Sequence, residues 1–101
     1  MNELKGSQRK YLRGLAHNLN PSAYVGQKGV TPALIEEIEL ALNATELIKL
    51  KFVEFKLKDQ KNQILDQVLA ETGAQLAGMI GHVAILYRRH AEKEKRTITL
   101  P

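Results

Sequence analysis

The chain has 101 residues, near the usual size of one domain, and carries a formal net charge of +4 at pH 7. It contains no cysteine, which excludes disulfides, thiolate metal sites and cysteine nucleophiles, and no apolar run approaches the ~18 residues that span a bilayer. The first residues also lack the apolar stretch of a secretory signal. We therefore expect one soluble domain over residues 1–101, located in the cytoplasm.

The first predicted element is a helix over about residues 5–19. Its apolar positions follow the i, i+3, i+4, i+7 spacing of an amphipathic helix and are Leu12, Leu15, Ala16 and Leu19. The opposite face carries a ladder of donors, Arg9, Lys10, Arg13 and His17. Pro21 ends the helix, and Ala23-Tyr24-Val25 is predicted as a short strand. Such a basic face suits phosphates, although basic helix faces are more often simply solvated.

The segment Gly26-Gln27-Lys28-Gly29 joins this strand to a second helix. Thr31 is a preferred N-cap residue, and Pro32 suits the first helical position. The glycines permit close backbone approach, amides at the helix start point outward, and Lys28 adds a positive charge. This combination favours a phosphate contact. An ordinary turn between strand and helix explains the four-residue pattern equally well.

The second predicted helix is apolar along Leu34, Ile35, Ile38, Ala41 and Leu42, and its acidic residues Glu36, Glu37 and Glu39 face water. Residues 47–52 then alternate, which predicts a half-buried strand with Lys49 and Lys51 on its polar side. These lysines are candidate phosphate contacts, or they protect a strand edge against aggregation.

A third helix is predicted from an Asp59 cap to about Thr72, with Gly73 at its C-terminal left-handed position. Two strands, 75–80 and 83–87, follow around a tight turn at residues 81 and 82. The order α-β-α-β-α-β-β predicts an α+β fold of two layers with a four-stranded mixed sheet. The tail from about residue 88 is charged, and we expect it to be mobile or only partly docked.

Charge is segregated along the chain. Residues 32–46 contain four glutamates and no lysine or arginine, whereas the flanking segments are basic. Arg88 follows the last strand and is a further candidate contact. Basic groups in four segments around an acidic helix predict a basic face and an acidic face, as expected of a nucleic-acid binder.

Sequence patterns for catalysis or cofactors are weak. The three histidines lie in different segments without metal-ligand spacing, and the glycine-rich loop lacks the Lys-Ser/Thr ending of a nucleotide-binding loop. We therefore expect no catalytic residue, no metal, no cofactor and no small-molecule substrate. With only five aromatic residues, recognition should depend on backbone and shape more than on extensive base stacking.

Five motifs, in order along nearly the whole chain, resemble the CRM domain, and in particular the bacterial stand-alone YhbY-type proteins. They are Leu12-Arg13-Gly14-Leu15-Ala16-His17, Val25-Gly26-Gln27-Lys28-Gly29-Val30-Thr31, Glu46-Leu47-Ile48-Lys49-Leu50-Lys51, Thr72-Gly73-Ala74 and Ile85-Leu86-Tyr87-Arg88. The resemblance implies a fold similar to the C-terminal domain of bacterial translation initiation factor three. It also implies RNA binding and association with precursors of the large ribosomal subunit. The family's Gly-x-x-Gly loop corresponds to Gly26–Gly29.

The sequence thus predicts a monomeric, ribosome-associated protein that binds ribosomal RNA and assists assembly of the large subunit. The predicted contacts are Gly26, Gln27, Lys28, Gly29, Arg9, Lys10, Arg13, Lys49, Lys51 and Arg88. The alternative is a protein-interaction module that docks on a ribosomal protein or assembly factor through the acidic helix.

Overall fold

The structure is a computed structural model and describes residues 3–101. Its helices are α1 (Gly6–Ala16), α2 (Pro32–Thr45) and α3 (Lys58–Thr72), with a short 3₁₀ helix, η1 (Lys93–Lys95). Its strands are β1 (Ala23–Val25), β2 (Leu47–Phe52), β3 (Gln75–Ile80) and β4 (Val83–Tyr87). The predicted element order is therefore confirmed. No helix within residues 3–101 is long and apolar enough to span a membrane.

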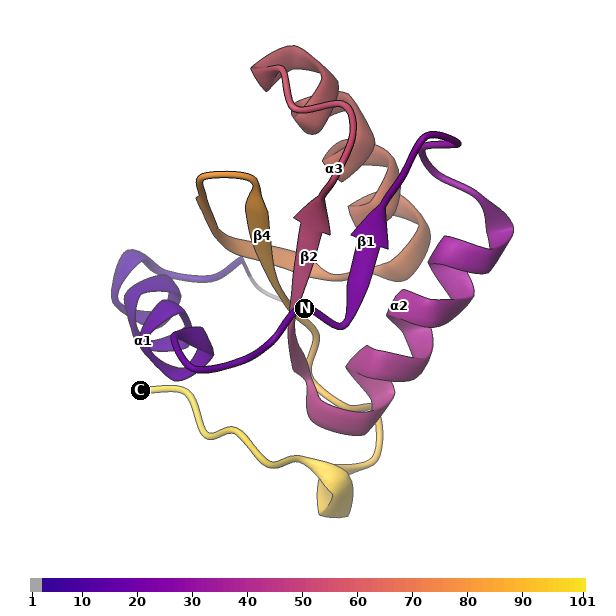
Figure 1. Cartoon of the computed structure of the whole chain (residues 1–101). Helices are drawn as coiled ribbons and strands as arrows, with labels where there is room; N and C mark the ends of the chain where they lie inside the picture. Colours follow the sequence, from indigo (N-terminus) through magenta and orange to yellow (C-terminus); the bar gives the residue numbers. More distant parts are fainter. Residues whose placement is uncertain (1–2) are drawn as a thin grey trace.

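The four strands form one mixed sheet in the order β1-β2-β4-β3 (Figure 1). β1 pairs with β2 in parallel, as the α2 crossover requires, and β4 pairs antiparallel with both β2 and β3. The predicted mixed, four-stranded sheet is confirmed. β1 is an edge strand, and its C-terminal end leads into the Gly26–Gly29 loop.

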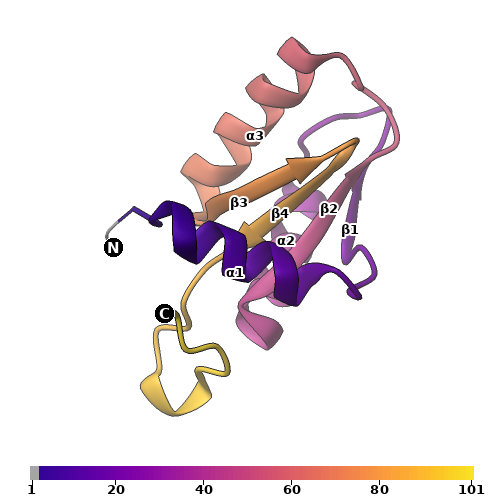
Figure 2. The same ribbon diagram turned by 90° about the vertical axis from the view of Figure 1, so that its left-hand side faces the viewer.

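The sheet is covered on both faces, so the expectation of two layers was wrong. α2 and α3 pack on one face, and α1 lies across the other, over β3, β4 and β2 (Figures 1 and 2). The reason is visible in β2. Ile48, Leu50 and Phe52 enter the core under α2 and α3, whereas Leu47 faces α1 and packs with Leu12. Apolar residues on both faces of a strand need cover on both sides.

The helix ends differ from the predictions in two places. The first helix ends at Ala16, because His17 and Leu19 donate only to the carbonyls three residues back, at 3.2 and 2.9 Å. Leu19 is then outside the helix and exposed. The third helix begins at Lys58, so Asp59 stands in its first turn and is not its cap. The predicted Thr31 cap is confirmed, since its Oγ1 accepts a 3.1 Å hydrogen bond from the amide of Leu34.

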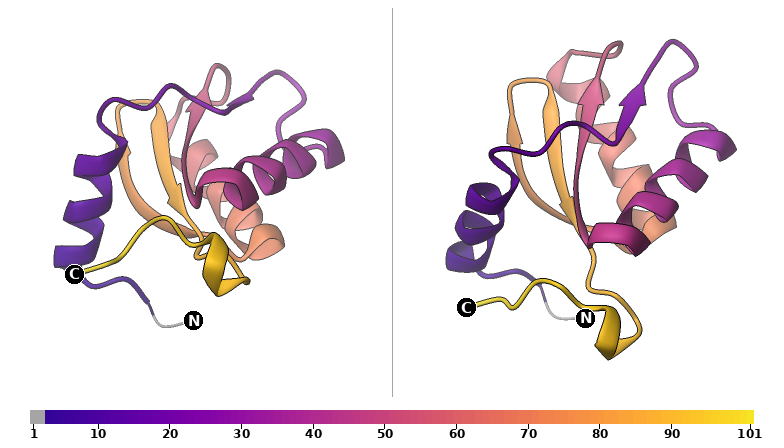
Figure 3. Two further views of the ribbon diagram at one scale, coloured as in Figure 1. Left: turned by 90° about the horizontal axis from the view of Figure 1, so that it is seen from below. Right: turned by 60° about the horizontal axis from the view of Figure 1, so that its bottom comes forward.

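The tail after β4 runs along the bottom of the molecule (Figure 3). Of the two expectations, mobile or only partly docked, the structure agrees with the second, because most tail side chains are exposed and only a few pack. Ile98 and Leu100 pack against the core under α1, and Pro101 O accepts a hydrogen bond from Gln8 Nε2 at 3.2 Å. The anchor is Glu46, which is 1% exposed and has a left-handed backbone, φ 66°.

The Glu46 carboxylate accepts hydrogen bonds from three tail amides. These donors are His90 N at 2.7 Å, Thr97 N at 2.7 Å and Ile98 N at 3.1 Å. Burial raises the pKa of the carboxyl, but the amide donors outweigh burial and hold the pKa of Glu46 below its ordinary value. Glu46 therefore joins the end of α2 to the tail as a carboxylate.

Candidate nucleic-acid interface

The Gly26–Gly29 loop forms a tight turn at the open end of β1. The amide of Gly29 donates to Gly26 O at 3.0 Å, and Gly29 has φ 64°, a conformation that favours glycine. Gln27 and Lys28 stand at the corner of the turn, exposed, and within residues 3–101 their amides donate to no protein acceptor. The loop thus offers two main-chain donors and one ammonium group to solvent.

A hollow of about 430 Å³ lies beside this loop. It is bounded by the four loop residues, by Tyr24 on β1, and by the first turns of α2 with Thr31, Ala33, Leu34 and Glu37. Glu37 is the acidic residue of that lining. The loop can therefore contact an extended anion from its outer side, while Glu37 disfavours negative charge deeper along α2.

Lys51 lies next to the loop hollow through the sheet register. Its Cα partner on β1 is Tyr24, which lines the hollow, and its side chain is exposed on the face opposite α2 and α3. Lys49 is two residues back on the same face, with Nζ 3.2 Å from His17 O at the end of α1. The structure therefore brings together the loop and both predicted strand lysines.

The basic ladder of α1 is divided between two ends of the sheet. Arg13 lines a groove of about 260 Å³ with His17 and Lys49, beside the open half of the sheet. Its Nη1 donates to Ala77 O at 2.9 Å, and its side chain lies over Gly78, where an added Cβ would be 2.6 Å from Arg13 Cδ. Glycine at position 78 thus gives Arg13 room to lie flat on β3.

Arg9 and Lys10 lie at the opposite end. Arg9 Nη1 donates to Leu4 O at 2.7 Å, and Arg9 borders a hollow at the Gln75 end of β3. The β3–β4 turn is at the other end of this strand, next to Ile80. Lys10 borders Pro101 of the docked tail. Neither joins the surface formed by Lys28, Lys49 and Lys51.

Arg88 is held within the fold. Its Nη1 donates to Glu39 Oε2 at 2.8 Å and to Thr72 O at 2.7 Å, and its Nη2 donates to Asn43 Oδ1 at 3.0 Å. The side chain is 18% exposed. Arg88 therefore ties the end of β4 to α2 and α3, and its donors are directed away from the candidate surface.

Replacing Arg88 with methionine should lower the free energy of unfolding by about 2 kcal/mol, because the Thr72 carbonyl and the Glu39 carboxylate lose a charged donor. Urea denaturation measures the change. Arg89→Met is the matched control, since Arg89 is the exposed neighbour and should change stability by less than about 0.5 kcal/mol. Equal effects from the two substitutions would contradict the structural role of Arg88.

Basic groups at the β3–β4 turn were not singled out from the sequence. Lys61 Nζ lies 3.0 Å from Gly81 O and 3.3 Å from His82 Nδ1. Desolvation, followed by the positive charges of Lys61 and Lys56, lowers the pKa of His82. In the sequence, these lysines belong to the basic block at residues 47–61. Only the fold shows that two of them, Lys56 and Lys61, lie near this turn.

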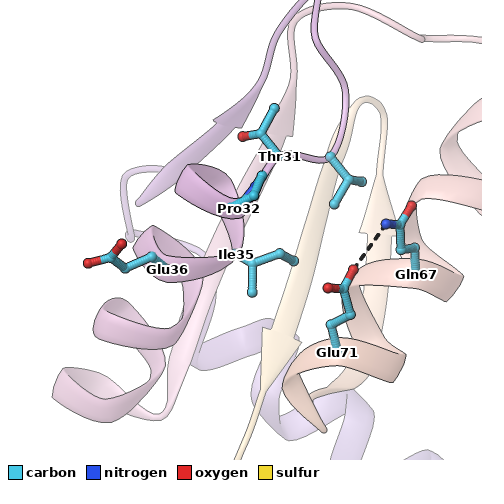
Figure 4. A pocket seen from close by; sticks show the side chains of 7 residues that line it. Thr31, Pro32, Ile35, Glu36, Gln67 and Glu71 are labelled. Carbon is cyan, nitrogen blue, oxygen red and sulfur yellow. Dashed lines mark hydrogen bonds between the residues drawn. The ribbon is translucent and has the colours of Figure 1, made fainter.

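The acidic side of the molecule lies between α2 and α3. A hollow of about 440 Å³ there is lined by Glu36 and Glu71 together with Ile35 and Gln67, and Gln67 Nε2 donates to Glu71 Oε2 at 3.0 Å (Figure 4). Glu36 points away from that pair (Figure 4). Because its lining is acidic, this hollow is unsuited to a phosphate. Among residues 3–101, no group of three or more His, Asp or Glu side chains is arranged to hold a metal ion.

The CRS1 / YhbY (CRM) domain profile matches residues 4–88. This chain belongs to that family. The match includes the Gly26–Gly29 loop, β2 and the β3–β4 hairpin, so the resemblance carried by the five sequence motifs is confirmed.

Relatives and one solved structure extend over almost the whole CRM chain. An RNA-binding protein of Haemophilus influenzae is 41% identical over 101 residues, covering 100% of this chain and 98% of the relative. The "Probable RNA-binding protein YqeI" of Bacillus subtilis is 36% identical, covering 97% and 99%. A solution structure from Staphylococcus aureus, described as a putative RNA binding protein, has 32% identity and a TM-score of 0.79, covering 97% of this chain and 99% of that one. This chain therefore shares its α+β fold with the Staphylococcus aureus structure.

Proposed function

We propose that this protein binds RNA by contacting backbone phosphates with the amides of the Gly26–Gly29 loop and with Lys28, Lys49 and Lys51. The observation that carries the proposal is the continuity of this surface, because Tyr24 lines the loop hollow and pairs in register with Lys51. Free amides beside an exposed ammonium suit a phosphate, and the lysines on β2 suit the next phosphates along the RNA strand. The relatives' names as RNA-binding proteins support the same class of ligand.

Arg13 contributes from the margin of this surface, across the groove from Lys49. Arg9 and Lys10 would be reached only by an RNA that continues around α1 toward the other end of β3. Arg88 is not part of the proposed contact, since its guanidinium already donates to Glu39, Thr72 and Asn43.

We further propose that the RNA is ribosomal RNA in precursors of the large subunit, and that the protein assists assembly in the cytoplasm. The resemblance to YhbY-type proteins supports this step. Crosslinking in cells, followed by sequencing of the attached RNA, is the test, read beside sedimentation on ribosome gradients. We expect crosslinks concentrated in large-subunit RNA and protein in the precursor fractions. Crosslinks spread over unrelated messenger RNAs would overturn the assembly role.

Charge reversal at Lys28 tests the loop. Lys28→Glu should weaken binding to protein-free ribosomal RNA by about 10-fold, and to unrelated RNA sequences by a similar factor, because a phosphate contact carries no sequence information. Filter binding measures both affinities. Lys93→Glu is the matched control, because Lys93 is exposed on η1 at the far end from the loop (Figure 1).

Two results would argue against the loop contact. Equal losses for Lys28→Glu and Lys93→Glu would mean that only net charge matters. Association that requires a ribosomal protein and persists at high salt would favour docking through the acidic helix, where Glu36 and Glu37 are exposed and Glu39 is paired with Arg88.

A further inference from the structure

One half of the α1 face of the sheet is left open. α1 lies over β3, β4 and part of β2, and a row of four residues in register crosses the sheet beside α1, at the end of the sheet that holds the β3–β4 turn. The row runs from β1 to β3 as Tyr24, Lys51, Val83 and Ile80. Since neighbouring strands lie ~4.8 Å apart, the row is about 14 Å long.

The row combines an aromatic ring, a positive charge and apolar side chains. Tyr24 is 52% exposed and Ile80 is 60% exposed, with Lys51 between them and also exposed. An exposed tyrosine on a sheet face is a surface on which an unpaired base can stack, and an adjacent lysine can neutralise the phosphate of the same nucleotide. Tyr24, Lys51 and Ile80 are exposed and Val83 is half-buried, so most of the row is accessible to a ligand.

We propose that Tyr24 is a stacking site for one unpaired RNA base, with Lys51 on the phosphate of that nucleotide. The site deepens the proposed function and rests on it, since the same strand of RNA continues from Tyr24 to the Gly26–Gly29 loop, whose hollow Tyr24 also lines. Val83 and Ile80 extend the platform toward β3 and can support the neighbouring base.

The charges around the row favour nucleic acid over an apolar protein segment. The groove that continues from Val83 and Ile80 toward α1 is lined by Arg13, His17, Lys49 and Ile85, so neither the row nor this groove contains an acidic side chain. A row that combines aromatic and apolar side chains with Lys51, and that has Arg13 and Lys49 in the groove on its α1 side, matches the alternation of base and phosphate along a single strand of RNA.

The test compares two RNA hairpins that differ by one unpaired nucleotide, at matched length and salt. The native protein should bind the hairpin with the unpaired nucleotide about 10-fold more tightly than the fully paired one, because only the former supplies a free base face. Tyr24→Ala should abolish that preference, so that the variant binds the two hairpins with affinities within about 2-fold of each other. Tyr24→Phe should retain the preference, since stacking needs the ring and not the hydroxyl group.

Tyr11→Ala is the matched control, because Tyr11 is 42% exposed on α1 and lies outside the row. It should leave the preference unchanged. If Tyr24→Ala keeps the full preference, the stacking site is wrong even though RNA binding stands. If the native protein binds neither hairpin, the proposed function itself fails. Thermal unfolding of each variant shows whether a loss of binding reflects loss of the fold.

Discussion

Glu46→Gln is expected to lower the free energy of unfolding by about 3 kcal/mol at pH 7 and to release the C-terminal tail. Glutamine keeps one acceptor oxygen but turns an NH₂ group toward a buried amide donor, and the tail amides of His90, Thr97 and Ile98 all depend on these two oxygens. The apolar contacts of Ile98 and Leu100 are then lost as well.

The free energies of unfolding of the native protein and of Glu46→Gln should become similar at acid pH. The pKa of Glu46 is lowered in the folded state, so its contribution to stability is fully present above the ordinary carboxyl pKa and is lost as pH falls through the folded pKa. Urea denaturation at pH 7 and at successively lower pH measures the difference between native protein and variant. We expect this difference to shrink below about pH 4.

Amide hydrogen exchange at Thr97 and Ile98 gives the local readout, and it should accelerate in Glu46→Gln more than in the core strands. Glu94→Gln removes an exposed carboxylate from η1 and serves as the control. Unchanged protection of the Thr97 and Ile98 amides in Glu46→Gln would contradict the anchoring role of Glu46.

The second large effect is on binding. Lys28→Glu combined with Lys51→Glu should reduce RNA affinity by about 100-fold at moderate salt, because two proposed phosphate contacts are replaced by repulsion on one continuous surface. The substitutions lower the formal charge from +4 to 0. Electrophoretic mobility shift or fluorescence anisotropy measures the affinity.

The control must carry the same net charge. Lys93→Glu with Lys95→Glu also brings the chain to 0, and it removes only the exposed Lys95–Glu92 ion pair, 2.8 Å long. It should weaken binding by less than about 3-fold. A comparable loss in both double variants would mean that RNA responds to the overall field of the protein and not to the proposed surface.

Local patterns predicted most of the fold. Alternation along Leu47–Phe52, the Thr31-Pro32 start and Gly73 each act over a few residues, and each is found as expected. The number of layers was missed because it depends on strands that are apolar on both faces: Leu47 of β2 faces α1, and β4 buries Ala84 and Leu86 on one face and Ile85 and Tyr87 on the other. The continuous apolar run of β4 was the available signal, but it does not say which helix covers the second face.

The candidate surface was also predicted only in part, because local patterns place some of its residues and not others. Lys49 and Lys51 share a face by strand periodicity, and the loop follows a parallel strand beside them, so their proximity follows from local rules. Arg88 and Glu46 could not be assigned, because their partners lie 16 to 52 residues away in sequence. Tertiary contacts decide which partner a charged residue has. From the sequence pattern alone, such a residue cannot be distinguished from an unpaired surface charge.

The most direct test of the phosphate-contact surface is the salt dependence of RNA affinity for the native protein. Contacts with ~4 to 6 phosphates predict that a plot of log affinity against log salt concentration has a slope of about −3 to −5. A slope near zero would show that counterions are not released on binding, and would contradict a surface on which Lys28, Lys49 and Lys51 contact the RNA backbone.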